Sequence, residues 1–177
     1  IAYLGSLAHF GADPEPQVVA GVVSALGMVR RLFVPDSSAA LFAPYARRTL
    51  APALERFGRE KRPGEDEAIG AMRGELLGAL ARLGEDEQVA AFAREAAARY
   101  LADPASVDPG IVDAVLTLAA RKGDAALFAD VQQRYQATTV PLLKRRWLTT
   151  LGSFEDPALE AKALEYMLSD AVPPTEG

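Results

Sequence analysis

The sequence of 177 residues contains no cysteine and a single histidine, His9. Disulfide bonds and thiolate metal sites are therefore excluded, and nothing in the composition indicates a redox compartment. One histidine cannot supply the two imidazoles, one helical turn apart, that bind zinc in an H-E-x-x-H motif. His9 stands among apolar residues near an expected helix end, so we interpret it as structural or solvent-facing rather than as a metal ligand.

Other patterns that carry chemistry are also missing. The sequence has no Gly-x-Ser-x-Gly nucleophile elbow and no Gly-x-x-x-x-Gly-Lys phosphate loop. The longest apolar run, residues 18–29, is too short to cross a bilayer, so no membrane span is expected. The formal net charge of −5 disfavours nucleic acid as a partner, because phosphate binding requires a positively charged surface. No window alternates apolar and polar residues over the length of a strand, so no sheet is expected.

Half of the residues are hydrophobic, and an acidic cap followed by an amphipathic helix recurs between residues 83 and 168. The capping residues Asp86, Asp124 and Asp156 lie 38 and 32 residues apart, which is a period typical of helical repeats. Positions three, seven and eleven after each Asp are apolar and share one helix face. They are Val89, Ala93 and Ala97, then Leu127, Val131 and Tyr135, then Leu159, Ala163 and Met167.

Each capped helix is followed by a second one, opened by Asp108-Pro109 in one repeat and by Val140-Pro141 in the next. One such hairpin cannot bury its apolar face alone, so the hairpins must stack. The pattern predicts an all-α fold, a right-handed α-solenoid of antiparallel helical hairpins that is HEAT- or armadillo-like. About nine helices are expected, in a single helical-repeat domain over residues 1–177.

Outside the repeats, residues 17–32 form a helical pattern that is apolar nearly all round, so we expect a central, buried helix. Residues 39–57 are helical in pattern, with Pro44 and Pro52 predicting a late start and a kink. Residues 58–66 are rich in charge and predict a solvated loop. Gly70, Gly74 and Gly78 share a helix face and predict the close approach of another helix.

Several charged clusters require interpretation. Glu65-Asp66-Glu67 could be imagined as acid–base machinery, but the run lies in the most polar segment, so exposure to solvent is the simpler interpretation. The basic clusters are Arg30-Arg31, Arg47-Arg48 and Lys144-Arg145-Arg146. Trp147 follows the last of them and aligns with an apolar position of the preceding repeat, so we expect a core side chain rather than a platform for peptide stacking.

Blocks in a fixed order resemble a known family. They are residues 73–84 (RGELLGALARLG), 106–109 (SVDP), 119–124 (AARKGD), 147–152 (WLTTLG) and 168–173 (LSDAVP). The order is similar to that of the C-terminal helical domain of zinc aminopeptidases such as aminopeptidase N, puromycin-sensitive aminopeptidase and the endoplasmic reticulum aminopeptidases. The family's H-E-x-x-H motif and its Gly-x-Met-Glu-Asn stretch are absent here.

The resemblance implies a non-catalytic domain that covers the cleft of a metallo-aminopeptidase and shapes peptide access. Its partners would be the catalytic domain of the same parent chain and the peptide substrate; zinc would be bound in the catalytic domain and no cofactor here. Lys144, Arg145 and Arg146 are then candidates for binding a peptide carboxylate. The alternative is a free-standing helical-repeat scaffold for protein–protein interaction.

The chain starts at Ile1 rather than at a methionine, and residues 173–177 look like a loop. We therefore expect a section of a larger C-terminal domain. Exposed apolar faces at the ends of a helix stack favour self-association, here through residues 1–10 or through the last helix.

Overall fold

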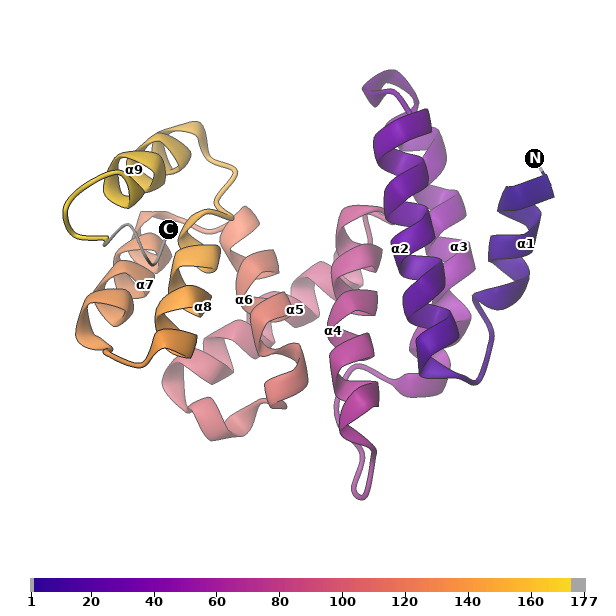
Figure 1. Ribbon diagram of the computed structural model, residues 1–177, viewed down its shortest axis with the longest axis horizontal. Coiled ribbons are helices and arrows are strands. Elements are labelled where there is room, and N and C mark those ends of the chain that lie inside the picture. The colour runs from indigo at the N-terminus through magenta and orange to yellow at the C-terminus, as the bar shows by residue number, and fades with distance from the viewer. Residues whose placement is uncertain (1, 173–177) are drawn as a thin grey trace. The chain divides into compact units, whose positions relative to one another are not determined.

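The computed structural model describes residues 2–172, with side chains from Gly5 onward (Figure 1). Within this range the chain folds into nine α-helices and two short 3₁₀ turns, with no strand. The helices are α1 (Ala2–Phe10), α2 (Pro16–Phe33), α3 (Ala39–Phe57), α4 (Glu67–Arg82), α5 (Glu87–Ala102), α6 (Pro109–Arg121), α7 (Ala125–Ala137), α8 (Pro141–Leu151) and α9 (Pro157–Met167).

The predicted all-α class is confirmed, and no helix in the described range is long and apolar enough to span a membrane. Contacts divide the chain into two compact units, the first ending at Val115 and the second starting at Leu116, within α6. The single domain over residues 1–177 stays a prediction. Ile1 and the loop expected at residues 173–177 lie outside the described residues.

The capping pattern read from the sequence is present in the structure. Asp86, Asp124 and Asp156 each precede a helix, and their carboxylates accept hydrogen bonds of 2.9–3.1 Å from backbone N–H groups two or three residues on. Pro109 and Pro141 begin α6 and α8, where a missing N–H costs nothing. The predicted apolar stripe is buried in all three repeats except at Leu127 and Met167, which are half-buried.

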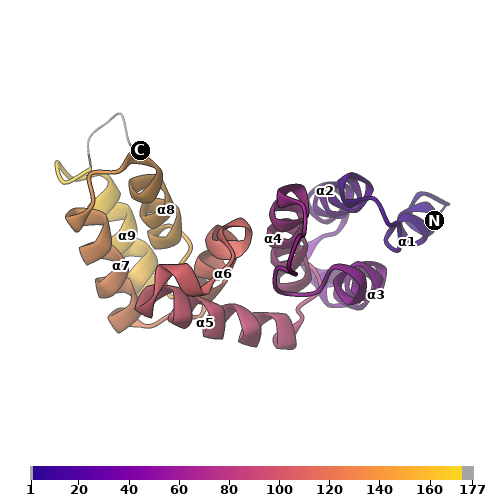
Figure 2. The same ribbon diagram turned by 90° about the horizontal axis from the view of Figure 1, so that it is seen from below.

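In the first unit, α2 and α3 pack against α4, and α1 contacts α2 and α3 (Figure 2). Helix α2 differs from the expectation of a helix buried all round. Its inward face is buried at Val19, Val22, Leu26 and Val29. On the other faces Leu32 and Phe33 are 61% and 75% exposed. The reason is that the described neighbours of α2 leave part of its circumference uncovered, which the apolar composition of the segment does not reveal.

Helix α3 begins at Ala39, so the late start predicted from its prolines is wrong. Pro44 and Pro52 both lie inside the helix, where each removes a backbone donor at a cost of about 3 kcal/mol. Apolar side chains on the inward face, including Phe42 and Leu50, are buried along the whole helix. Burial of each large side chain contributes roughly 1.5–3 kcal/mol, and together these contributions outweigh the unfavourable helix propensity of the two prolines.

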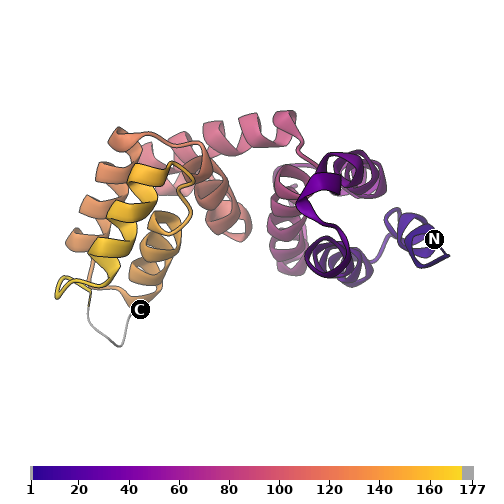
Figure 3. The same cartoon turned by 90° about the horizontal axis from the view of Figure 1, so that it is seen from above.

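The second unit is built on the pair α7 and α8, and α9 lies over this pair (Figure 3). The rings of Phe128 and Phe154 meet edge to face with centroids 5.2 Å apart, and those of Tyr135 and Tyr166 do so at 5.9 Å. Such aromatic pairs contribute about 0.5–1.5 kcal/mol beyond their buried area. The tyrosine pair joins α9 to α7, and the phenylalanine pair joins the loop before α9 to α7.

The close approach predicted from the glycines of α4 is found at two of the three positions. A Cβ on Gly74 would lie 2.7 Å from the carbonyl oxygen of Gly110 in α6, and one on Gly70 would lie 3.6 Å from the Cα of Gly110. A Cβ on Gly78 would meet only the side chain of Arg82. Helices α4 and α6 therefore touch backbone to backbone through small residues.

We expect Gly110→Ala to lower the free energy of unfolding by about 1–3 kcal/mol, because overpacked sites force the backbone to shift. The added Cβ would lie 2.7 Å from the carbonyl carbon of Gly70 and 2.8 Å from its Cα, and backbone atoms cannot rotate away. Denaturant unfolding measures the change. The control is Gly21→Ala, where a Cβ meets nothing within 4 Å. It should be neutral or stabilise α2 by up to about 1 kcal/mol, and equal losses in both variants would contradict the packing argument.

Candidate functional site

The most concentrated polar site of the described chain is centred on Arg73 of α4, whose side chain is completely buried. Its guanidinium donates hydrogen bonds to Glu65 Oε2 at 2.5 Å and to Asp108 Oδ2 at 3.2 Å. It also donates to the backbone carbonyl oxygens of Phe57 at 3.1 Å and Gly58 at 3.2 Å. One side chain thus joins the end of α3, the following loop, α4 and the start of α6.

Local sequence explains why these groups converge. Arg73 lies one turn after Ile69 and one turn before Leu77 on the inward face of α4, so the helix directs it into the core. Asp108 precedes Pro109 and divides its two carboxylate oxygens. Oδ1 accepts the N–H of Gly110 at 3.1 Å and caps α6, while Oδ2 faces Arg73. The same carboxylate therefore caps the start of a helix and pairs with a buried positive charge.

The surroundings of Glu65 favour its ionised form. Burial acts to raise the pKa of Glu65, but hydrogen bonds from the Arg73 side chain and the Arg62 backbone, together with the charges of both arginines, outweigh it. The pKa of Glu65 is therefore lowered from its usual value. Chemically this is an ion cluster in which four oxygen acceptors surround one guanidinium, an arrangement that suits cross-linking of segments.

We expect Glu65→Gln to destabilise the protein most at neutral pH. Because the folded pKa of Glu65 lies below the unfolded one, its stabilising contribution is complete above the unfolded pKa of about 4.3 and disappears as pH falls through the folded pKa. A hydrogen bond to a charged group contributes about 1.5–3 kcal/mol. Urea unfolding of wild type and variant from pH 7 down to the acid range measures the difference.

The matched control for that titration is Glu60→Gln in the same loop. Glu60 pairs with Arg99 at 2.6 Å, but the two side chains are 58% and 48% exposed. Exposed pairs contribute only about 0.2–1 kcal/mol, so a small effect is expected. If the difference in unfolding free energy between wild type and Glu65→Gln stayed constant from neutral to acid pH, it would contradict the role assigned to the Glu65 charge.

The predicted exposure of the acidic run Glu65-Asp66-Glu67 to solvent holds for only part of the run. Glu65 is not solvated, because its side chain is 8% exposed and ion-paired with Arg73. Asp66 caps α4 by accepting the N–H of Ala68 at 2.8 Å, and Glu67 lies in the first helical turn, where a negative charge is favourable. Residues 58–66 form the loop that connects α3 with α4.

Two shallow pockets flank Asp108. One, of about 370 Å³, is lined by the first turns of α4 and α6 together with Lys61 and Asp66. The other, of about 270 Å³, is lined by Lys61, Arg99 and the 3₁₀ turn Pro104–Ser106 (η2) with its flanks. Charges of both signs line each pocket, and none of the described residues forms a group of three potential metal ligands.

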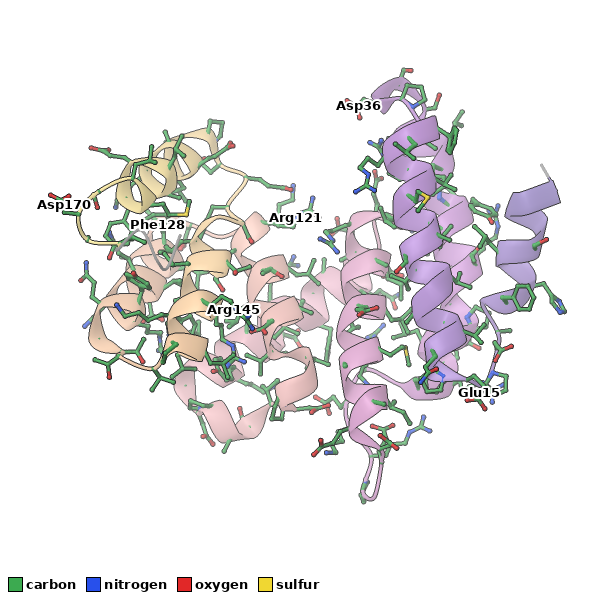
Figure 4. All side chains as sticks on the ribbon, in the orientation of Figure 1. Glu15, Asp36, Arg121, Phe128, Arg145 and Asp170 are labelled. Carbon is green, nitrogen blue, oxygen red and sulfur yellow. The ribbon has the colours of Figure 1, made fainter. Side chains whose placement is uncertain are left out.

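The basic residues proposed from the sequence lie on α8 and differ in their surroundings. Lys144 is half-buried, with Nζ 4.6 Å from the ring centroid of Tyr135. Arg145 is exposed (Figure 4), and Arg146 is half-buried. Adjacent positions on a helix diverge by about 100°, so the three do not face one common site. Any role of these residues in substrate binding stays a prediction.

Other sequence candidates have structural partners or lie exposed. Arg30 donates hydrogen bonds to the carbonyl oxygen of Val34 and to Asp36 Oδ1, both at 2.8 Å. His9 is exposed and its ring meets that of Phe10 edge to face at 5.4 Å, in agreement with a solvent-facing role.

Sequence reasoning missed a groove between α2 and α4, of about 650 Å³. Its walls combine small or apolar residues with charged ones: Val23, Ser24, Gly27, Met28, Arg31, Glu75, Ala79, Arg82 and Leu83. A Cβ on Gly27 would meet nothing within 4 Å, so the groove is open at this position. The groove could not be found from either helix alone, because its residues come from segments some fifty positions apart.

Comparison with known proteins relates the whole arrangement to one family. A family model described as "ERAP1-like C-terminal domain" matches residues 2–176. Among curated proteins, aminopeptidase M1 of Arabidopsis thaliana is 31% identical over 126 residues. The match covers 68% of this chain but only 14% of that protein. These findings confirm the resemblance seen in the ordered sequence blocks.

Proposed function

This chain belongs to the family of ERAP1-like C-terminal domains, and from that premise we propose that it is the non-catalytic helical domain of a zinc-dependent aminopeptidase. The family match over residues 2–176 is the observation that carries the proposal. The chain's own residues do not fit a zinc site, because the sequence offers one histidine and no cysteine. Zinc is therefore assigned to the catalytic domain of the parent protein, which removes N-terminal amino acids from peptides.

In this proposal the domain covers the active-site cleft of the parent and limits which peptides reach the metal. A wall of packed helices excludes water and restricts access, and motion of such a wall against a catalytic domain opens the cleft. The buried Arg73 cluster supports this role, since it holds the end of α3, the following loop, α4 and the start of α6 in a fixed arrangement. The catalytic domain of the same chain is the expected partner.

Among the basic residues of α8, Arg145 is the best candidate for contact with the peptide. It is exposed, whereas Lys144 lies against Tyr135 and Arg146 is half-buried. A guanidinium pairs with a carboxylate through two parallel hydrogen bonds, which gives both strength and orientation. Residues 1–177 would then be a section of the larger C-terminal domain.

The alternative is a free-standing helical-repeat scaffold that binds another protein. Exposed apolar side chains such as Phe33 and Leu41, 75% and 80% exposed, favour it, because apolar surface on a helical scaffold marks interaction sites. The coding sequence upstream of Ile1 distinguishes the two proposals. An H-E-x-x-H motif with a Gly-x-Met-Glu-Asn stretch supports the aminopeptidase, and a gene that starts near Ile1 supports the scaffold.

A kinetic experiment on the complete parent protein tests the role of the domain. Arg145→Gln is expected to raise KM for a long peptide and to leave hydrolysis of an aminoacyl-nitroanilide unchanged, since the small substrate does not reach the helical domain. The control is Arg94→Gln, an exposed arginine on α5. The 177-residue chain supplied with zinc should hydrolyse neither substrate. Turnover by this chain above background would overturn the non-catalytic assignment, and equal effects of Arg145→Gln on both substrates would overturn the peptide contact.

A further inference from the structure

Helix α9 presents two apolar faces. The inward one is buried at Leu159 and Ala163. A second apolar stripe on another side of the helix consists of Ala161, Leu164 and Leu168, which follow one another at steps of three and four residues and share one face. Leu164 is 57% exposed and Leu168 80% exposed. Two neighbouring leucines exposed on the outer side of a surface helix offer apolar area that a partner can cover.

Acidic residues border this outer stripe on both sides. At about 100° per residue, Glu160 lies roughly 70° to one side of the centre of the stripe and Glu165 roughly 70° to the other. Both glutamates are exposed. Asp170 follows shortly after the helix and adds a third exposed carboxylate near its C-terminal end (Figure 4). The outer surface of α9 is thus an apolar ridge between negative charges.

The groove between α2 and α4 has complementary properties. Its apolar lining includes Val23, Met28 and Leu83, with open space at Gly27. Arg31 of α2 and Arg82 of α4 are both exposed and supply one positive charge from each wall.

Charge and size both favour a helical ridge as the occupant of this groove. The acidic residue in the lining, Glu75, leaves the groove with a net charge of +1, opposite in sign to the borders of the α9 ridge. The groove has a volume of about 650 Å³ and is open to one side, so a few side chains of a partner helix can enter it.

We propose that the outer ridge of α9 of one copy of this chain docks into the α2–α4 groove of a second copy. Leu164 and Leu168 would enter the apolar part of the groove, while Glu160 and Glu165 would face Arg31 and Arg82. The two surfaces differ, so the contact is heterologous: each copy offers one ridge and one groove, and further copies add head to tail. This assigns the partner surface for the self-association expected through the last helix.

Charge-reversal pairs test the contact. Glu160→Lys with Glu165→Lys places positive charges around the ridge, and Arg31→Glu with Arg82→Glu places negative charges around the groove. Each double variant alone should raise the dissociation constant of self-association about tenfold or more, because like charges then face each other. An equimolar mixture of the two should associate again, since each reversed surface finds an opposite charge.

Sedimentation velocity over a range of concentrations and salt provides the readout. The sedimentation coefficient of the wild type should rise with protein concentration. It should fall when salt is added, because salt screens exposed charges and the copies dissociate. Glu55→Lys with Glu95→Lys is the matched control, since both residues are exposed and lie on other helices, and it should associate as wild type does. Leu164→Gln should weaken association without a loss of helicity. A monomeric wild type at all concentrations, or reversed variants that associate normally, or a mixture that stays monomeric, would each overturn the proposal.

Discussion

Replacing Arg73 with methionine should lower the free energy of unfolding by about 3–5 kcal/mol, because removal of one partner leaves buried charges uncompensated. The change leaves the carboxylates of Glu65 and Asp108, whose side chains are 8% and 9% exposed, without their ion-pair partner. It also removes the donors of the hydrogen bonds to two backbone carbonyls. Methionine keeps much of the volume and the helix propensity of arginine, so the loss reports the electrostatic role rather than a cavity. Denaturant unfolding at neutral pH measures it.

A double variant separates the charge from the packing. Arg73→Met combined with Glu65→Gln should be less destabilised than the sum of the two single variants, since the second change removes one of the stranded charges. Arg99→Met is the control at the exposed pair with Glu60, where a change of at most about 1 kcal/mol is expected. Additive losses, or a loss at Arg73 no larger than that at Arg99, would show that the cluster does not hold these segments together.

The same cluster shows where the sequence was informative and where it was not. Capping aspartates and proline starts depend on a few adjacent residues, so Asp86, Asp124 and Asp156 were recognised with their helices. Ion pairing of Arg73 with Asp108 joins residues 35 positions apart, and no local pattern reveals it. One signal was present: Arg73 shares the inward face of α4 with apolar residues, and a charge at such a position needs a partner.

The burial of apolar segments likewise depends on contacts with distant residues, which local patterns do not reveal. Periodicity identifies which side of a helix is apolar, but burial depends on how many neighbours cover it. Helix α2 is apolar nearly all round, but other helices cover only one of its faces. Helix α9 has the predicted apolar stripe on its inward side, and it also has an exposed ridge at Leu164 and Leu168 on the opposite side. Such surplus apolar surface is where partners must be sought, because it is not needed for the fold that is described.

Trp147→Ala is expected to cost about 3–5 kcal/mol of unfolding free energy, since the indole is 5% exposed in the second unit and its removal leaves a large cavity. The guanidinium of Arg134 lies 5.8 Å from its ring centroid and loses a cation–π partner in the variant. Far-UV circular dichroism follows the unfolding, because the variant lacks the only tryptophan of the chain. Leu142→Ala, at a 55% exposed position on the same helix, is the control and should change little.

The outcome at Trp147 also bears on the proposed peptide contact of α8. A buried indole fixes the rotation of the helix, so Trp147 and Leu148 face the core while Arg145 stays exposed. Trp147→Phe should then retain part of the stability, as expected for a core aromatic. An unchanged melting temperature in Trp147→Ala would instead mean that α8 is rotated with its tryptophan outward. In that case Arg145 would no longer be the residue of choice for a substrate carboxylate, and the kinetic test would have to move to another face of the helix.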